Sequence, residues 1–209
     1  RAGGVGVTES YAALLRAKAR VIHPDGCEPR HIDQILFGWQ TAVVHWAARL
    51  GRAAIFADCG LGKTLMQLEW ARAIGGPTLI LAPLAVASQT IAEAARIGLI
   101  VREVSTTTDD PIQIANYEKL HRLAPSAYRS IVLDESSILK SIDGKTRTKL
   151  LREWTAVPYR LCCTATPAPN DIAELGNHAE FLGVATRAEM LAEYFVHDDQ
   201  GWRQKGHAA

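Results

Sequence analysis

The sequence predicts an α/β domain of the doubly wound kind, built on a mainly parallel sheet. Short apolar runs alternate along the chain with stretches of helical periodicity, which is the pattern of strand–helix–strand units. Most of the runs are rich in Ile, Val and Leu without alternating polar residues, as is typical of strands buried on both faces. The chain has 209 residues, of which 48% are hydrophobic and 22% are charged. This is enough for one generous domain or two small ones, with a substantial core.

The apolar runs predict six strands, in chain order 53–57, 78–82, 99–104, 112–116, 130–134 and 159–165. Helical periodicity predicts helices over 34–50, 63–74, 85–96, 117–123, 145–154 and 171–182. Residues 9–19 also have helical periodicity, and residues 23–30 are rich in turn formers and predict a loop. We therefore divide the chain into an N-terminal helical extension, 1–35, and an α/β domain, 36–209. Ligands of such folds bind at the carboxyl ends of the strands, so the residues after each run are the candidates for function.

The composition excludes an intrinsically disordered or collagen-like chain. No apolar run approaches the ~20 residues that span a bilayer, and the N-terminus lacks the apolar segment of a signal peptide, so no membrane partner is expected. The net charge of +1 gives no strong overall attraction to nucleic acid, although it allows a local basic patch. Because the first residue is Arg rather than Met, we expect a fragment or a processed chain.

The four cysteines fit neither a disulfide framework nor a zinc site. Cys162 and Cys163 stand in an apolar run and are expected to be reduced core residues, in keeping with a reducing cytosol. His23, Cys27 and His31 are close in sequence, but a fourth metal ligand has no obvious source. We therefore expect no metal site there.

A glycine-rich segment, ADCGLGKT (57–64), follows the first strand and precedes a helix. Glycines let the backbone fold around phosphate oxygens with its N–H groups pointing inward, and the helix adds the positive end of its dipole. Lys63 would reach the β- and γ-phosphates and the Thr64 hydroxyl would ligate Mg²⁺, although Ala57 stands where the strict phosphate-loop pattern has Gly. ATP and Mg²⁺ are thus the expected cofactors. The predicted nucleotide-binding residues of the loop are Cys59, Gly60, Leu61, Gly62, Lys63 and Thr64.

Two carboxylates, Asp134 and Glu135, come at the end of the run 130–134. Such a pair is costly beside a buried strand unless it binds a metal or takes part in chemistry. In a phosphate-loop enzyme the Asp holds Mg²⁺ and the Glu orients and deprotonates the attacking water. Asp-Glu is a common dipeptide that also fits a solvated helix start, but the phosphate loop upstream favours the functional interpretation. The predicted catalytic residues are Glu135 and Lys63, and the predicted metal ligands are Thr64 and Asp134.

Six segments in register carry a resemblance to a known family. They are ADCGLGKT (57–64), LAPLAVASQ (81–89), IANYEKL (114–120), DESS (134–137), LKSIDGKTRTKLL (139–151) and CTATPAPNDIAEL (163–175). In this order they resemble the motifs of a superfamily 2 helicase, specifically the N-terminal RecA-like domain of a Swi/Snf-like one of the phage or bacterial kind. The resemblance covers about residues 36–182.

The resemblance implies the first lobe of a two-lobe DNA-dependent ATPase that translocates on or remodels duplex DNA. It also implies the cytosol of a bacterium or of a phage-infected host. The second RecA-like lobe, which in the family supplies arginine fingers and half of the nucleic-acid track, is missing from this sequence. We therefore expect an ATP hydrolase that is weakly active or inactive by itself.

The resemblance also assigns roles to single residues. Gln40, in LFGWQ (36–40), resembles the Q motif, whose side chain reads adenine, with Phe37 or Trp39 packing on the base. The alternative for this segment is the start of an amphipathic helix with aromatic residues in the core. The predicted nucleic-acid contacts are Pro83, Ser88, Asn116 and Tyr117.

Three hydroxyl residues, Ser137, Thr164 and Thr166, would couple the phosphate site to the nucleic-acid face by the same resemblance. Ser137 stands where the family has a His, so the way this link is made is open. The alternative for the two threonines is a cap or turn after a strand. Asn170 is expected to cap the helix that starts near Asp171.

Five cations lie close together: Lys140, Lys145, Arg147, Lys149 and Arg152. They fit either a solvated helix face or a patch for the backbone of duplex DNA. Trp70 and Trp154 are expected in the core. Two rival functions stay open, namely a fragment of the motor subunit of a restriction system and a non-catalytic nucleic-acid-binding scaffold with a vestigial phosphate loop.

Overall fold

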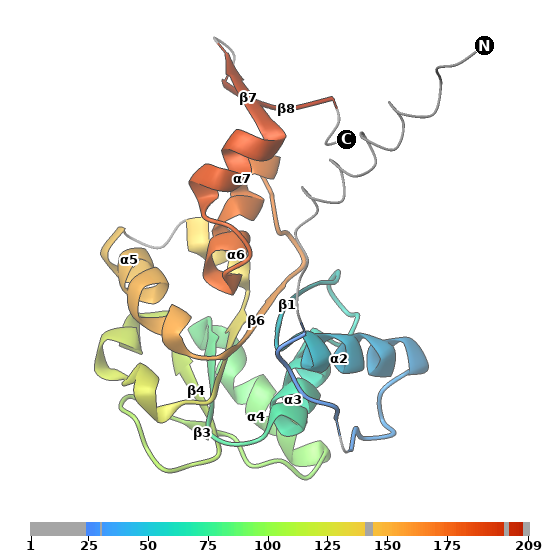
Figure 1. Cartoon of the computed structure of the whole chain (residues 1–209). Coiled ribbons are helices and arrows are strands. Elements are labelled where there is room, and N and C mark those ends of the chain that lie inside the picture. The colour runs from blue at the N-terminus through green and yellow to red at the C-terminus, as the bar shows by residue number, and fades with distance from the viewer. Residues whose placement is uncertain (1–23, 30, 141–143, 199–200, 207–209) are drawn as a thin grey trace, which may run out of the picture.

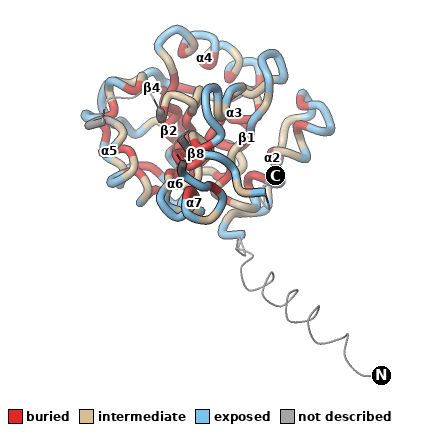
Figure 2. Tube along the Cα trace, turned by 90° about the horizontal axis from the view of Figure 1, so that it is seen from above, coloured by how far each residue is buried: buried red, intermediate tan, exposed pale blue. Residues whose placement is uncertain are grey.

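A computed structural model describes residues 24–29, 31–140, 144–198 and 201–206. Helices cover both faces of a central sheet, and the buried part of the chain is concentrated in its strands (Figures 1 and 2). The helix predicted over residues 9–19 lies outside the described residues.

Six strands form a sheet in the order β1-β6-β5-β2-β4-β3, and every neighbouring pair is parallel. Their bounds are Arg52–Phe56 (β1), Thr78–Ala82 (β2), Arg102–Glu103 (β3), Ile112–Asn116 (β4), Ser130–Asp134 (β5) and Tyr159–Thr164 (β6). The predicted doubly wound, parallel architecture is confirmed. The prediction was too long for β3, an exposed edge strand of two residues in the predicted run 99–104.

Five of the predicted helices contain an α-helix. The α-helices are α2 (Gly38–Leu50), α3 (Lys63–Ile74), α4 (Ala87–Arg96), α5 (Gly144–Glu153), α6 (Leu175–Leu182) and α7 (Arg187–Tyr194). Short 3₁₀ helices are η1 (Leu84–Val86), η2 (Tyr117–Arg122), η3 (Pro125–Ala127), η4 (Ser136–Lys140), η5 (Trp154–Ala156) and η6 (Ile172–Glu174). The predicted helix 117–123 is therefore a 3₁₀ helix, and the helix 171–182 begins as one.

Two hydrophobic clusters occupy the two faces of the sheet because successive strand residues point to opposite sides. Ile80 and Val132 pack with α2, α3 and α4 on one face, whereas Leu81 and Leu133 pack with α5 and α6 on the other. Trp70 lies in the first cluster and Trp154 in the second, and both are fully buried as predicted. Cys162 and Cys163 are buried, which confirms that they are core residues.

The described part of the N-terminal extension packs against α2 and α3. The Gly26 and Cys27 N–H groups donate to the carbonyls of Arg49 and Ala48 at the end of α2, at 3.0 and 2.9 Å. This approach requires glycine, because a Cβ on Gly26 would lie 1.8 Å from the Ala48 carbonyl oxygen. Further along, the Asp33 N–H donates to the buried Glu69 carboxylate of α3 at 3.1 Å.

Beyond the sheet, α7 leads into an antiparallel hairpin of β7 (Phe195–Asp198) and β8 (Gly201–Gln204), which projects from the end of the domain in Figure 1. This hairpin was not predicted from the sequence. The predicted cap at Asn170 is wrong by one residue, since the Asp171 side chain accepts from the Ala173 N–H at 2.8 Å. None of the helices within the described residues has the length and apolar character needed to cross a membrane.

Candidate functional site

The order of the strands places the three predicted active segments side by side. In the parallel register, Phe56 of β1 pairs with Thr164 of β6, and Asp134 of β5 pairs with Cys163 of β6. The phosphate loop, the DESS segment and the TAT segment therefore leave the sheet at its carboxyl edge from three adjacent strands. The sequence separates these segments widely, and the fold brings them together.

The predicted phosphate loop, residues 57–64, folds around its own lysine. Lys63 is the first residue of α3, and its Nζ donates to the carbonyls of Ala57 and Asp58 at 2.8 and 3.0 Å. Gly60 and Gly62 have φ angles of +80° and +74°, in the left-handed region that favours glycine. The loop thus ends at the N-terminus of a 12-residue helix, where the dipole and the first N–H groups attract an anion. Cys59 and Leu61 are exposed at this loop.

Gln40 braces the phosphate loop from α2. Its side chain is only 4% exposed. The amide oxygen accepts from the Phe37 N–H, and the amide nitrogen donates to the Leu61 carbonyl, both at 2.9 Å. The structure therefore gives the Gln40 amide partners within the chain, and its contact with adenine stays a prediction. Phe37 and Trp39 are exposed rather than buried in the core, so the alternative of core aromatic residues does not hold for them.

Asp134 is held by Gln67, a fully buried residue of α3 that was not among the predicted site residues. The Gln67 Nε2 donates to Asp134 Oδ1 at 2.7 Å. Burial raises the pKa of Asp134, the Gln67 hydrogen bond and the nearby Lys63 ammonium lower it, and the neighbouring Glu135 raises it. The sequence signal that could have identified Gln67 is its position, a polar residue one turn after Lys63 on the side of α3 that faces the sheet.

The residues present fit a magnesium ion. The Thr64 hydroxyl and the Asp134 carboxylate are the hard oxygen donors that Mg²⁺ prefers. Partial burial disfavours an isolated charge on Asp134, and a cation beside the carboxylate would offset that cost. Within the described residues, no group of three or more His, Cys, Asp or Glu side chains is arranged to hold a metal, so the remaining ligands would be phosphate oxygens and waters. Of the three side chains weighed as metal ligands near the N-terminus, Cys27 donates its thiol to the Ala73 carbonyl, and His23 lies outside the described residues.

Glu135 is fixed by two of the three predicted coupling residues. Ser137 Oγ donates to Glu135 Oε1 at 2.5 Å, and Thr164 Oγ1 donates to the same oxygen at 2.7 Å. Thr164 also accepts from the Thr166 N–H at 3.0 Å, which closes the turn after β6. The predicted catalytic carboxylate is therefore joined directly to the TAT segment, and Oε2 lies outside both of these bonds.

The predicted nucleic-acid residues lie at the same edge of the sheet, after β2 and β4, whose ends pair at Ala82 and Asn116. Ser88 is exposed on α4 and Pro83 is half-buried. The Asn116 side chain accepts from the Glu118 N–H at 2.7 Å and caps η2. Tyr117 does not lie on the surface where the prediction placed it. It is 5% exposed, and its hydroxyl donates to the Asp134 carbonyl at 2.8 Å. This bond links the end of β4 to the end of β5.

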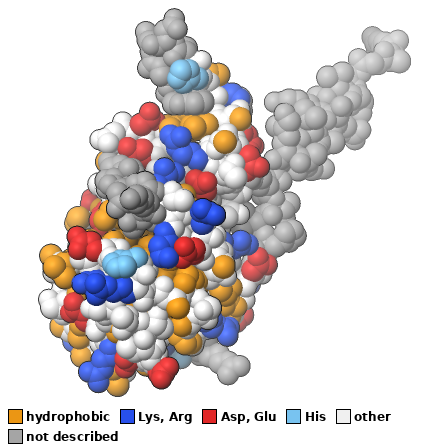
Figure 3. Space-filling view, turned by 90° about the vertical axis from the view of Figure 1, so that its left-hand side faces the viewer, with side chains coloured by type: hydrophobic (Ala, Val, Ile, Leu, Met, Phe, Trp, Pro, Cys, Tyr) orange, Lys and Arg blue, Asp and Glu red, His pale blue; other side chains and the backbone are white. Residues whose placement is uncertain are grey.

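The cations of α5 are partly neutralised within the chain. Arg147 donates to the Asn177 amide oxygen at 2.7 Å and lies 3.6 Å from the Glu180 carboxylate, and Lys149 pairs with Glu153 at 2.6 Å. Basic and acidic side chains are interspersed on the face seen in Figure 3. The side chains of Lys140 and Lys145 lie outside what the structure describes. These contacts favour a solvated, salt-bridged helix face over a DNA patch.

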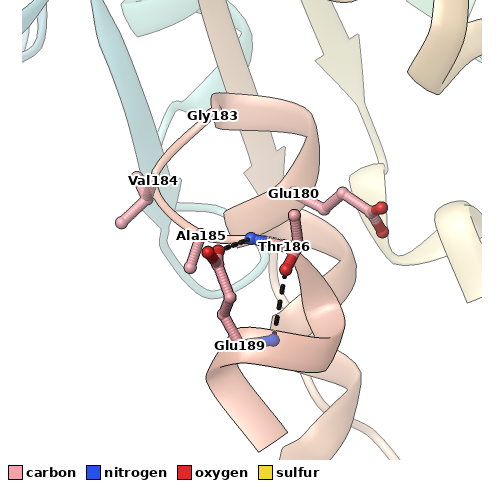
Figure 4. A pocket seen from close by; sticks show the side chains of 6 residues that line it. All are labelled: Glu180, Gly183, Val184, Ala185, Thr186 and Glu189. Carbon is pink, nitrogen blue, oxygen red and sulfur yellow. Dashed lines mark hydrogen bonds between the residues drawn. The ribbon is translucent and has the colours of Figure 1, made fainter. Parts of the chain in front are cut away.

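A cavity of about 220 Å³ lies elsewhere, between the end of α6 and the start of α7. Figure 4 shows its lining, in which Glu189 and Thr186 bond each other's backbone N–H groups as a capping box. It contains none of the predicted site residues.

Comparison with known proteins gives structural matches only, since no family model and no curated protein matches the chain. The SWI2/SNF2 ATPase core of Sulfolobus solfataricus in complex with dsDNA matches with a TM-score of 0.67 and 21% identity, over 80% of this chain and 40% of that one. The UvsW helicase from bacteriophage T4 matches with a TM-score of 0.58 and 13% identity, over 88% and 67%. The helicase domain of Pyrococcus furiosus Hef matches with a TM-score of 0.56 and 20% identity, over 69% and 35%.

These likenesses show that the chain has the RecA-like fold of helicase ATPase domains, as the sequence predicted. The chain spans 40% of the length of the first of these structures.

Proposed function

We propose that this chain is the ATP-binding first lobe of a nucleic-acid-dependent ATPase that couples ATP hydrolysis to movement along, or remodelling of, duplex DNA. The observation that carries the proposal is the Glu135 carboxylate, bonded to both Ser137 and Thr164 beside the phosphate loop. A scaffold that kept only the fold of the loop would have no need of this arrangement. The S. solfataricus ATPase core solved with dsDNA supports duplex DNA as the partner.

Each residue of the site has a task that its position supports. The Lys63 ammonium, now bonded to two loop carbonyls, would exchange these neutral partners for the β- and γ-phosphate oxygens of ATP. Gln40 holds the loop through the Leu61 carbonyl and keeps its backbone in the anion-binding shape. Mg²⁺, held by Thr64 and Asp134, would neutralise charge that develops on the phosphates. Glu135 would orient the attacking water and accept its proton.

The second lobe enters the proposal as a partner. An arginine finger supplied by another element is worth about 10³–10⁵ in rate for related phosphate-loop enzymes. The chain described here should therefore bind Mg·ATP and hydrolyse it slowly, with rapid turnover only when a second RecA-like lobe and DNA complete the site.

The first test is a calorimetric titration of Mg·ATP into the parent chain and Lys63→Ala, with circular dichroism to show that both are folded. Loss of the ammonium should weaken binding by about 10-fold or more, because charged hydrogen bonds to phosphate are lost. Lys149→Ala is the matched control, since it removes a lysine paired with Glu153 on α5. A folded parent that binds no nucleotide but retains DNA affinity would favour the scaffold interpretation instead.

Glu135→Gln separates catalysis from binding. The Gln amide oxygen can still accept from Ser137 and Thr164, so the local geometry is preserved while the base is lost. Mg·ATP affinity should stay within about twofold of the parent, and single-turnover hydrolysis should fall by about 10²–10⁴-fold. Equal turnover by the parent and Glu135→Gln would remove Glu135 from the reaction.

A further inference from the structure

The backbone at Glu135 has an unusual conformation that its surroundings must hold in place. With a φ of 55°, Glu135 is the one non-glycine residue with positive φ among the described residues. An L side chain rarely adopts this conformation, and it persists only where the surroundings enforce it. The turn directs the Glu135 carboxylate toward Thr164 while the next residue, Ser136, enters the core.

Ser136 is anchored by a histidine from a distant helix. Ser136 is fully buried, and its Oγ shares a hydrogen bond of 3.0 Å with Nε2 of His178 on α6. His178 is itself 96% buried, since its exposed fraction is 4%. The bond joins Ser136 Oγ to one side of the ring only, since the buried Nδ1 has no hydrogen-bond partner among the described residues. In a buried, low-dielectric environment such a bond fixes one arrangement of the two side chains.

The same imidazole contacts the strand that leads into the phosphate loop. The rings of His178 and Phe56, the last residue of β1, are in edge-to-face contact with centroids 5.3 Å apart. Burial lowers the pKa of His178, which keeps the ring neutral and suited to a hydrogen bond with a hydroxyl. One side chain thus touches the residue before the loop and the residue after the predicted base.

We propose that His178 is a positioning residue for Glu135: by holding Ser136 in the core it fixes the left-handed turn that presents the Glu135 carboxylate to Thr164 and to the nucleotide. This inference rests on the proposed function for its effect on hydrolysis, and on geometry alone for its effect on the turn. α6 follows the TAT segment in the chain, so a shift of α6 relative to the sheet would reach Glu135 through this contact.

Three variants and a control isolate the contact in the full chain. His178→Phe keeps a ring beside Phe56 and removes the hydrogen bond, Ser136→Ala removes the other partner, and His178→Gln restores an amide nitrogen near the place of Nε2. Asn177→Ala is the matched control, because it removes a buried polar contact from the adjacent position of α6, toward Arg147 on α5.

The catalytic readout is single-turnover hydrolysis at saturating Mg·ATP, beside the calorimetric affinity. We expect His178→Phe and Ser136→Ala to slow hydrolysis by about 10-fold or more with affinity within about twofold, because misplacement of a catalytic group costs rate rather than binding. A variant that combines His178→Phe with Ser136→Ala should be no slower than either single variant, because both changes remove the same hydrogen bond. His178→Gln should recover most of the rate. Asn177→Ala should keep the parent rate. A loss of equal size in Asn177→Ala, or no recovery in His178→Gln, would reduce His178 to a structural residue.

The geometric readout needs no nucleotide. Hydrogen–deuterium exchange over residues 134–140 should be faster in His178→Phe and Ser136→Ala than in the parent and Asn177→Ala, because the turn loses its anchor. If the parent binds no ATP, the proposed function fails while this exchange still decides the role of His178 at the turn. Unchanged exchange in both variants overturns the inference, whatever the hydrolysis shows.

Discussion

Replacing Gly62 by alanine tests how the phosphate loop and α2 depend on each other. Gly62 precedes α3 with φ +74° and ψ 32°, so the loop is in the left-handed conformation there. A Cβ at this position would lie 2.5 Å from Nε2 of Gln40, the atom that donates to the Leu61 carbonyl. The substitution therefore adds backbone strain and displaces a nearly buried amide.

The two costs are separate and similar in size. An L residue in the left-handed region costs about 1–2 kcal/mol, and loss of a largely buried hydrogen bond costs about 1 kcal/mol. Gly62→Ala should therefore lower the free energy of unfolding by about 2–3 kcal/mol. For a chain of this length, that corresponds to a decrease in Tm of roughly 4–12 °C.

The assay is thermal and urea unfolding of four variants. Gly60→Ala is the matched control, since Gly60 lies in the same loop with φ +80° but a Cβ there would meet no atom within 4 Å. It should lose only the strain cost of about 1–2 kcal/mol. Gln40→Ala and the variant that combines it with Gly62→Ala complete a double-mutant cycle. The combined variant should be destabilised by about 1 kcal/mol less than the sum of the two single variants, because both changes remove the same hydrogen bond from Gln40 to the Leu61 carbonyl. Equal destabilisation by Gly62→Ala and Gly60→Ala, or strict additivity, would refute the brace between Gln40 and the loop.

Three further predictions concern buried groups. Gln67→Leu should cost about 1.5–3 kcal/mol near pH 7, as the hydrogen bond to the charged Asp134 is lost. The cost should shrink on acidification in urea titrations, because the Gln67 hydrogen bond lowers the pKa of Asp134 and so stabilises the charged carboxylate more than the protonated one. Burial lowers the pKa of His178 below 6.5, so the unfolded chain binds more protons than the folded chain just below pH 6.5. The free energy of unfolding should therefore decrease as the pH is lowered through this range. His178→Gln should reduce this pH dependence in thermal scans. Under native conditions iodoacetamide should modify the exposed Cys59, whereas Cys162, whose thiol pKa is raised by burial, should react only when the chain unfolds. Peptide mass spectrometry can follow both reactions, and Mg·ATP should protect Cys59. Modification of Cys162 before unfolding would contradict the described core.

The parts of the fold that follow from local chemistry were predictable from the sequence. The phosphate loop combines glycines, a lysine and a helix start within eight residues, and β2, β4 and β5 have the predicted bounds because continuous apolar runs define them. The helix predicted over 117–123 was wrong in type, since the Asn116 side chain caps a 3₁₀ helix of six residues and the Tyr117 side chain is buried, with its hydroxyl bonded to the Asp134 carbonyl. The β7–β8 hairpin has no alternating pattern long enough to predict.

The candidate site was predictable in its residue types but not in its contacts. Glu135 and Ser137 were assigned from one segment and Thr164 from another, and only the register of β5 and β6 shows that Ser137 and Thr164 donate to the same oxygen of Glu135. Gln67 and His178 belong to no motif. Each is a polar residue on an apolar helix face, and its partner, Asp134 or Ser136, can be identified only when the strand end that faces the helix is known. Such contacts between distant segments depend on the order of strands, which local sequence patterns do not define.

That order of strands has a consequence for how the protein is made. β6 is the last of the six sheet strands to be synthesised, yet it lies between β1 and β5 in the finished sheet. On a nascent chain that ends before Tyr159, the strands that carry Lys63 and Asp134 to the edge of the sheet have no common neighbour to align them. Late insertion of a central strand is slow, because long-range pairing must close a large loop first. A ribosome-bound chain therefore brings the loop after β1 and the end of β5 into alignment only once β6 has been made, and a chain without β6 would lose the alignment of the candidate site rather than a peripheral edge.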